Sequence, residues 1–195
     1  MTQINYQIGF PDEERQRAAS LYDAAFGEKF GIGIPNKTQR LAVLADGFEP
    51  SRSITAVHEG HVVGMAGFHD QESSLTGGIT AEILRRHTGW LGMLRAVVVF
   101  AFFERKPKPD ELLMDGITVD PAMRGQGVGT GLLRELFVYA KEQGYQTIRL
   151  DVINTNPRAR SLYEREGFVA TETASFAFLE GILGFSASTT MQKEV

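Results

Sequence analysis

The sequence predicts an α/β protein built on one mixed β-sheet, and three observations support this prediction. The chain has 195 residues, of which 43% are hydrophobic, so one domain can bury a core of its own. In the second half, strand-like and helix-like stretches alternate, which predicts parallel strands joined by right-handed crossovers. In the first half, two strand-like stretches meet at Glu59-Gly60, which predicts a hairpin and antiparallel pairing.

The first half contains the shorter elements. Pro11 and a run of acidic residues open a helix in which apolar residues such as Ala18 and Leu21 recur at a spacing of three to four. Three glycines then predict a loop over residues 27–35. The other elements predicted here are a strand at residues 5–8, a helix at residues 37–44, and strands at residues 53–59 and 61–68.

The second half is more regular. A helix is predicted at residues 127–144 because leucines form a stripe along it and a glycine ends it. The other elements predicted here are a helix at residues 156–166 and strands at residues 111–119, 147–152, 168–173 and 186–193. We expect one domain over residues 1–195 with an apolar helical insert at about residues 76–106.

The apolar insert centres on residues 90–103, with the sequence WLGMLRAVVVFAFF. This stretch is too short to cross a bilayer as a helix. We expect a helix that packs on the sheet or in a dimer interface. Basic residues such as Arg86 and Arg105 flank it, so a helix on a membrane surface is the alternative that we weigh against this expectation.

Composition excludes several functional classes. The chain has no cysteine, which rules out disulfides, thiolate metal sites and a cysteine nucleophile, and which suits a reducing compartment such as the cytoplasm. A net charge of -4 argues against nucleic-acid binding. The four histidines do not have the spacing of a metal site. The first residues lack the basic flank and apolar run of a signal peptide.

The most specific motif is DPAMRGQGVGTGLLRELF, which begins at Asp120 between a predicted strand and a predicted helix. Three alternate glycines allow the backbone to approach a ligand, and the first turn of the helix offers unpaired N–H groups at its positive end. Arg124 adds a charge-assisted contact. The pattern therefore indicates a phosphate site. It matches neither the dinucleotide fingerprint nor the nucleoside-triphosphate loop, because the required glycine and Gly-Lys-Ser/Thr are absent. A glycine turn that merely starts a helix remains the alternative.

A second motif follows in LDVINTNPRARSLYEREGF, from Leu150. Asn156 and Pro157 are typical of a helix start, and Ala159 and Tyr163 share one face of that helix. With Arg124-Gly-Gln-Gly-Val-Gly upstream, this segment resembles the GNAT superfamily of N-acetyltransferases. The resemblance covers residues 112–168, and the first half of the chain carries no specific motif of the family.

The resemblance implies a GNAT-like fold, in which a central mixed sheet is splayed between the parallel strands at 111–119 and 147–152 and helices cover both faces. It also implies that acetyl-CoA lies in the opening, with its pyrophosphate on the glycine turn and its pantetheine arm along the first strand. No metal is expected. Asn156 matches a position that contacts the pantetheine arm, and capping of the helix is an equal interpretation. The coenzyme-binding residues expected are Ile117, Val119, Arg124, Gly125, Gln126, Gly127, Val128, Gly129, Thr130 and Asn156.

The resemblance also implies direct attack of an amine on the thioester. Tyr163 matches the family tyrosine that protonates the leaving thiolate, and a core tyrosine on an apolar helix face is the alternative. A main-chain N–H near Val119 would stabilise the carbonyl oxygen. Asp115 is our candidate for the base, because a lone carboxylate in an apolar strand is costly to bury and because it lies four residues before Val119, on the same expected face. A structural aspartate is an equal interpretation. His69 and Glu82 are further candidates, and a water relay would need none of them.

The expected function is acetyl transfer from acetyl-CoA to a small-molecule amine. The alternatives are a protein or peptide N-acyltransferase and a CoA-sensing domain without turnover. We place the acceptor pocket among residues 22–34, residues 75–90 and the tail after Thr173. Phe176, Phe178 and Phe185 are interpreted either as an apolar wall of this pocket or, equally, as core or dimer contacts. A homodimer is left open, and membrane contact is not expected.

Overall fold

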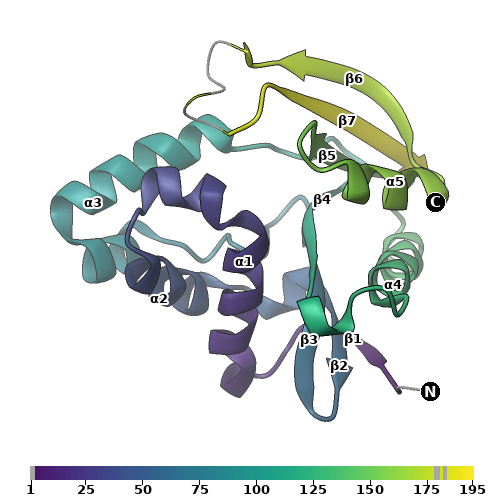
Figure 1. Ribbon diagram of the computed structural model, residues 1–195, viewed down its shortest axis with the longest axis horizontal. Helices are drawn as coiled ribbons and strands as arrows, with labels where there is room; N and C mark the ends of the chain where they lie inside the picture. Colours follow the sequence, from purple (N-terminus) through teal and green to yellow (C-terminus); the bar gives the residue numbers. More distant parts are fainter. Residues whose placement is uncertain (1–2, 178–180, 182–183) are drawn as a thin grey trace.

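The computed structural model describes residues 3–177, 181 and 184–195, and it contains one seven-stranded mixed sheet (Figure 1). The strand order is β1-β2-β3-β4-β5-β7-β6. Of the six neighbouring pairs, β4 and β5 run parallel and the others run antiparallel. The strands are β1 Asn5–Ile8, β2 Ser53–His58, β3 His61–His69, β4 Glu111–Val119, β5 Thr147–Ile153, β6 Val169–Ser175 and β7 Ala187–Glu194.

Helices cover both faces of this sheet, as the family resemblance implies. Helices α1 and α2 lie over one face, and α4 and α5 lie over the other (Figure 1). The helices are α1 Arg15–Gly33, α2 Lys37–Gly47, α3 Ala81–Phe103, α4 Val128–Glu142 and α5 Pro157–Arg165. Single turns of 3-10 helix occur at Asp12–Glu14, Pro50–Arg52 and Pro121–Met123.

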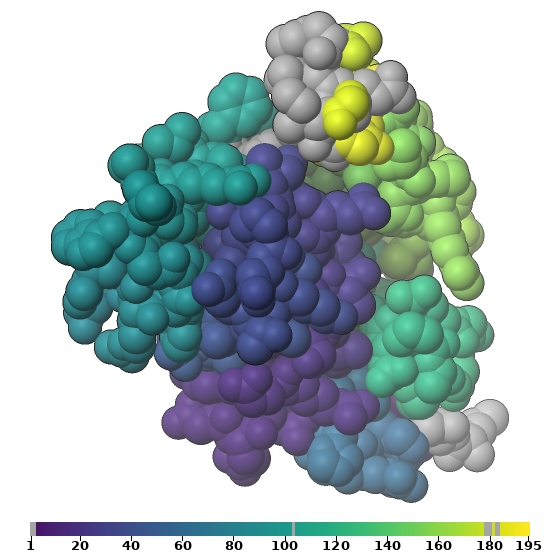
Figure 2. Space-filling view, turned by 60° about the vertical axis from the view of Figure 1, so that its left-hand side comes forward, coloured from purple at the N-terminus to yellow at the C-terminus, as the bar shows by residue number. Residues whose placement is uncertain are grey.

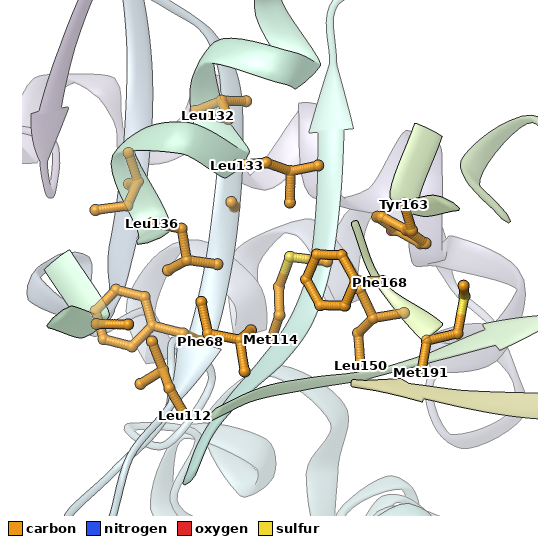
Figure 3. Packing of buried hydrophobic residues seen from close by; sticks show 14 of the residues in the cluster. Phe68, Leu112, Met114, Leu132, Leu133, Leu136, Leu150, Tyr163, Phe168 and Met191 are labelled. Carbon is orange, nitrogen blue, oxygen red and sulfur yellow. The ribbon is translucent and has the colours of Figure 1, made fainter. Parts of the chain in front are cut away.

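The main core lies between the sheet and helices α4 and α5. The leucine stripe of α4 meets Phe68 of β3 and Met114 of β4, and α5 adds Tyr163 beside Phe168 (Figure 3). All of these side chains are buried. A second core under α1 and α2 contains Tyr22 and Leu44. The middle of the sheet is therefore held between two apolar layers, which fixes the strands that surround the site.

The hairpin predicted at Glu59-Gly60 is confirmed. Both residues adopt positive φ, 51° and 82°, as the tight turn between β2 and β3 requires. The strands and the helices of the second half, with β7 at the end, also lie where the sequence predicts them, to within a few residues.

The loop predicted over residues 27–35 is wrong, because α1 continues to Gly33. A Cβ atom at Gly33 would lie 2.9 Å from the ring of Phe100 and 3.4 Å from the backbone of Ala96, both in α3. Glycine here lets two helices approach closely and does not break the helix. Arg40 of α2 forms a buried ion pair with Asp23 in the middle of α1 and donates to the carbonyl of Ile34, which holds the end of α1 in place.

The apolar insert forms α3, which is a helix with a kink at Gly89 (φ 71°, ψ -179°). The helix packs against α1 and α2. The expected packing on the sheet is therefore replaced by packing on other helices, because α1 and α2 already cover that face. None of the helices among the described residues combines the length and the apolar composition that a membrane span requires.

Candidate functional site

The sheet divides at β4 and β5. These two strands pair from Glu111 with Thr147 as far as Met114 with Leu150. Beyond that point β4 stays paired with β3, while β5 stays paired with β7. The two halves of the sheet therefore separate at the carboxyl ends of the parallel strands, where α/β folds place their ligands.

The free edge of β4 presents backbone groups to the opening. Asp120 donates its N–H to the carbonyl of Val63 in β3. Because hydrogen-bonding direction alternates along a strand, the backbone groups of Ile117 and Val119 are directed away from β3 and toward the opening. An extended ligand lying there would continue the sheet. This arrangement suits the contacts expected of Ile117 and Val119.

A β-bulge in β4 stands at the point of division. Gly67 of β3 pairs with Gly116 and the next residue, Phe68, pairs with Met114, so Asp115 is the extra residue. The bulge shifts the alternation of side chains along β4. Met114 packs in the core under α4, and Val119 packs against that core too, although they are five residues apart.

The expectation that Asp115 and Val119 share a face is therefore wrong. Val119 lies within 4.0 Å of a Cβ atom built at Gly129 of α4, while Asp115 interacts with Tyr22 and Lys29 of α1. A regular strand would have kept residues four apart on one face, and the extra residue of the bulge cancels that relation.

Asp115 has the properties of a base kept in an apolar setting. Burial raises its pKa to about 6 from an ordinary value of 3.8, and the nearby charges of His69 and Lys29 oppose this shift. One carboxylate oxygen, Oδ2, is buried and has no hydrogen-bond partner among the described residues. Burial and the Asp115 carboxylate also raise the pKa of the Tyr22 hydroxyl. A carboxylate with an unused oxygen and a pKa near neutrality can accept a proton from a substrate.

The glycine turn lies at the mouth of the opening. Gly125 and Gly127 have φ of 79° and 82°, and a Cβ atom at either would meet nothing within 4 Å, so the space beside the turn is open. Gly127 is the N-cap of α4 and has no side chain with which to cap it. The first N–H groups of α4, from Val128 to Thr130, therefore remain for a ligand. This cradle fits an anionic diphosphate.

The neighbouring side chains of the turn are fixed by the protein itself. Arg124 donates from Nε to the carbonyl of Val119 at 3.2 Å, which holds the guanidinium beside the end of β4. Gln126 donates its side-chain amide to the carbonyl of Ala122 at 3.2 Å, which leaves its main-chain N–H as the group offered to a ligand. Gly129 has a different role from the other two glycines. A Cβ atom there would lie 3.3 Å from Leu162, so this glycine brings α4 close to α5.

Tyr163 and Asn156 belong to α5, on the α4 side of the sheet. The ring of Tyr163 lies 5.8 Å from that of Phe168 and is buried (Figure 3). Burial raises the pKa of its hydroxyl, so the phenol keeps its proton at neutral pH. Asn156 accepts the N–H of Ala159 at 3.1 Å, which confirms its role as helix cap. The cap uses the side-chain oxygen and does not use the side-chain amide nitrogen.

Several residues near Asp115 were not singled out from the sequence, although residues 22–34 were expected to belong to the acceptor pocket. The ring of Phe26 would lie only 2.2 Å from a Cβ atom at Gly116, so α1 rests directly on the bulge. Lys29 lies in the segment that was predicted as a loop. A prediction that the helix continues through this segment would have placed Lys29 on the same side of the helix as Tyr22. Arg105 approaches Asp151 of β5 at 3.9 Å from the segment after α3.

The remaining candidates lie in other places. Glu82 is in the first turn of α3 and pairs with Arg86 at 3.3 Å. Among the described residues, no group of His, Cys, Asp and Glu could hold a metal ion. Phe176 and Phe185 stack edge to face with ring centres 6.0 Å apart, at the two ends of the β6–β7 connection, and Phe178 lies outside the described residues.

The fold and the site define a split mixed sheet with a free strand edge and a glycine turn at its opening, an arrangement that suits a phosphorylated, extended ligand. Comparison with known proteins identifies the class more closely. The family model described as Acetyltransferase (GNAT) family matches residues 15–168, and the chain belongs to this family of acyltransferases. The resemblance in the second half of the sequence is thus confirmed and extends over most of the chain.

Individual relatives agree with this assignment. The chain is 26% identical to the spore coat polysaccharide biosynthesis protein SpsD of Bacillus subtilis over 147 residues, 74% of this chain and 48% of the relative. It spans about half or less of the length of the curated relatives it matches. A crystal structure of an acetyltransferase shares 26% identity and a TM-score of 0.64, over 98% of this chain and 99% of the other. A GCN5-related N-acetyltransferase from Kribbella flavida, at 18% identity and a TM-score of 0.63 over 98% of both chains, shares the fold.

Proposed function

We propose that this protein transfers an acetyl group from acetyl-CoA directly to the amine of a small-molecule acceptor. The observation that carries the proposal is the division of the sheet beside a glycine turn. The edge of β4 offers backbone groups that are directed away from β3, and the turn at its end offers the N–H groups of a helix N-terminus. A ligand with an extended amide-containing arm and a diphosphate matches both features.

Acetyl-CoA would supply an activated acyl group as a thioester. Val119 and Ile117 would bind its pantetheine arm through their main-chain groups, and the amide of Asn156 would add a side-chain contact. The diphosphate would lie on the N–H groups of residues 126–130, beside Arg124. With these contacts the thioester would lie near the bulge in β4, where the two halves of the sheet begin to separate.

The two catalytic candidates lie on opposite faces of the sheet at this point. Asp115 faces α1, and Tyr163 packs on the side of α4 and α5. A base on one side and an acid on the other suit a direct transfer, in which the amine enters from one face and the thiol leaves on the other. Asp115 would remove the proton of the ammonium group, and Tyr163 would give its proton to the departing sulfur. The new C–N bond would form as the C–S bond breaks.

The energetic demands of the reaction fit these residues. An amine with an ordinary pKa of about 10.4 costs roughly 4–5 kcal/mol to deprotonate at neutral pH. Asp115 keeps an unused oxygen for this task, and its raised pKa brings it closer to the pKa of the amine. Tyr163 stays protonated because burial raises its pKa, so it remains a donor until the thiolate forms. A main-chain N–H of the β4 edge near Val119 would stabilise the charge that develops on the carbonyl oxygen.

A matched pair of glycine variants tests the donor site. Gly127→Ala and Gly60→Ala remove glycines with the same φ of 82°, and neither Cβ atom would meet a neighbour within 4 Å. The backbone strain is therefore alike, about 1–2 kcal/mol for each. We expect Gly127→Ala to raise the KM for acetyl-CoA and to reduce thermal stabilisation by acetyl-CoA. Gly60→Ala, in the β2–β3 hairpin, should change neither. Equal effects of both variants on coenzyme binding would remove the turn from the site.

The acceptor is identified with a thiol-release assay across polyamines, aminoglycosides, amino acids and short peptides. Release of free CoA with a small amine, at a rate well above hydrolysis, is the expected result. Release with peptides alone would indicate a protein acceptor. Binding of acetyl-CoA without release, for every amine, would indicate a CoA-sensing domain.

A further inference from the structure

The second segment of α3, from Trp90 to the end of the helix, carries apolar side chains on two opposite sides. One side contains Met93, Ala96 and Phe100, at spacings of three and four, and it packs against α1. The ring of Phe100 lies 5.2 Å from that of Phe30. This inner side accounts for the packing of the helix on the protein.

The other side of this segment faces away from the protein. Leu91, Leu94 and Val98 form a second stripe at the same spacing and are 86%, 60% and 64% exposed. Trp90 lies beside them and is 70% exposed. Figure 2 shows α3, in teal, as a ridge at the edge of the molecule. Four large apolar side chains exposed on one ridge form a contiguous patch, which marks an interaction surface on a soluble protein.

The charge around this outer face is mostly positive, although Arg86 pairs with Glu82 and Asp46, Arg105 with Asp151, and Lys106 with Glu104. Residues 81–108 contain six Lys and Arg against two Glu, a net charge of +4 in a chain whose net charge is -4. No acidic residue occurs between Glu82 and Glu104. Arg85 stacks on Trp90 at 5.6 Å, and Arg95 bonds to the carbonyl of Ile32 at the border of the inner side.

We propose that the outer face of α3, formed by Trp90, Leu91, Leu94 and Val98, docks the protein on an anionic lipid surface. The helix would lie in the plane of the interface, with its aliphatic stripe among the acyl chains and its arginines and lysines at the headgroups. Trp90 stands at the start of the stripe beside Arg85, and a tryptophan is well suited to the boundary between apolar and charged layers. The segment is about 20 Å long at 1.5 Å per residue, too short for a span.

The charge favours a lipid surface over a second copy of this chain. A symmetric dimer through the outer face would bring the same basic surface of both copies together, and like charges would repel. An anionic bilayer complements both the apolar stripe and the net positive charge. The outer face of α3 therefore favours an anionic bilayer as its partner. A dimer through this face would give a different result in sedimentation.

Sedimentation with vesicles tests the proposal directly. The full chain is mixed with vesicles of phosphatidylcholine alone or of phosphatidylcholine with phosphatidylglycerol. Leu94→Gln combined with Val98→Gln removes the centre of the stripe, and Val169→Gln, at a 67% exposed position of β6, is the matched control. We expect pelleting with the anionic vesicles, a decrease of about tenfold in partitioning for the double variant, and no change for the control. Lys106→Gln should weaken binding about fivefold at low salt.

Three results would overturn the proposal. The first is no pelleting with anionic vesicles, and the second is equal pelleting of the wild type and the double variant. The third is a dimer in sedimentation velocity that the double variant disperses, with no vesicle binding, which would assign the face to a second copy. Circular dichroism and thermal unfolding verify that the variants are folded, and acetyl-transfer activity is not needed for any of these measurements.

Discussion

Replacing Asp115 by asparagine should lower activity and raise stability at the same time. The carboxylate is buried in the bulge of β4, and its pKa is about 6 in the folded protein against an ordinary value of 3.8. A difference of roughly two pKa units corresponds to about 3 kcal/mol. The folded state therefore binds this proton more tightly than the unfolded state.

The sign of the pH dependence follows from this raised pKa. The stabilising effect of the protonated carboxyl is fully present below an ordinary value of 3.8 and is lost as the pH rises through about 6. Asp115→Asn has no such loss. The difference in unfolding free energy, variant minus wild type, should thus be larger at about pH 8 than at about pH 4 by as much as about 3 kcal/mol. Comparing the two pH values cancels any constant effect of the amide group.

Activity should change in the opposite direction. If Asp115 is the base, we expect kcat/KM of the asparagine variant to fall by about 10²–10⁴-fold at neutral pH. The ratio of wild-type to variant kcat/KM, measured by thiol release, cancels the titration of the acceptor amine. This ratio should be constant above about pH 7 and fall about tenfold per pH unit below about 6. A ratio that does not vary with pH, together with a stability difference that does not vary either, would refute the assignment.

Three further results are expected. Tyr163→Phe should lower kcat by about 10²-fold or more without reducing thermal stabilisation by acetyl-CoA, because the ring keeps its packing and only the proton donor is lost; an unchanged kcat would exclude Tyr163 from the mechanism. Asn156→Ala should lower the unfolding free energy by about 1 kcal/mol, because the hydrogen bond that caps the helix at Ala159 is lost. If the KM for acetyl-CoA also rises in this variant, Asn156 contacts pantetheine as well. Arg40→Leu should destabilise the fold by about 3–5 kcal/mol because it leaves Asp23 buried without its partner, and denaturant unfolding should show partial recovery when Asp23→Leu is added.

The sequence by itself determined the features that depend on neighbouring residues. The turn at Glu59-Gly60 and the cap at Asn156 are set by the backbone preferences of a few adjacent residues, and both occur as predicted. The glycine turn before α4 belongs to the same group, because Gly125 and Gly127 adopt positive φ for local reasons. The family motifs lie in these segments, and they were sufficient to identify the fold.

Only the tertiary structure decided the features that depend on distant partners. At the bulge, β4 has one residue more than β3, and this extra residue is Asp115. The bulge turns the Asp115 carboxylate toward α1, and a regular two-residue alternation could not predict this. Helix α1 continues to Gly33, where α3 packs closely against it. The glycines of residues 27–35, considered without this contact, predict a loop. The outer face of α3 is exposed because α1 and α2 already cover the sheet. In each case the deciding contact joins residues that are far apart in the chain. Local conformational preferences contribute only fractions of a kcal/mol for each residue, so packing between such distant residues outweighs them.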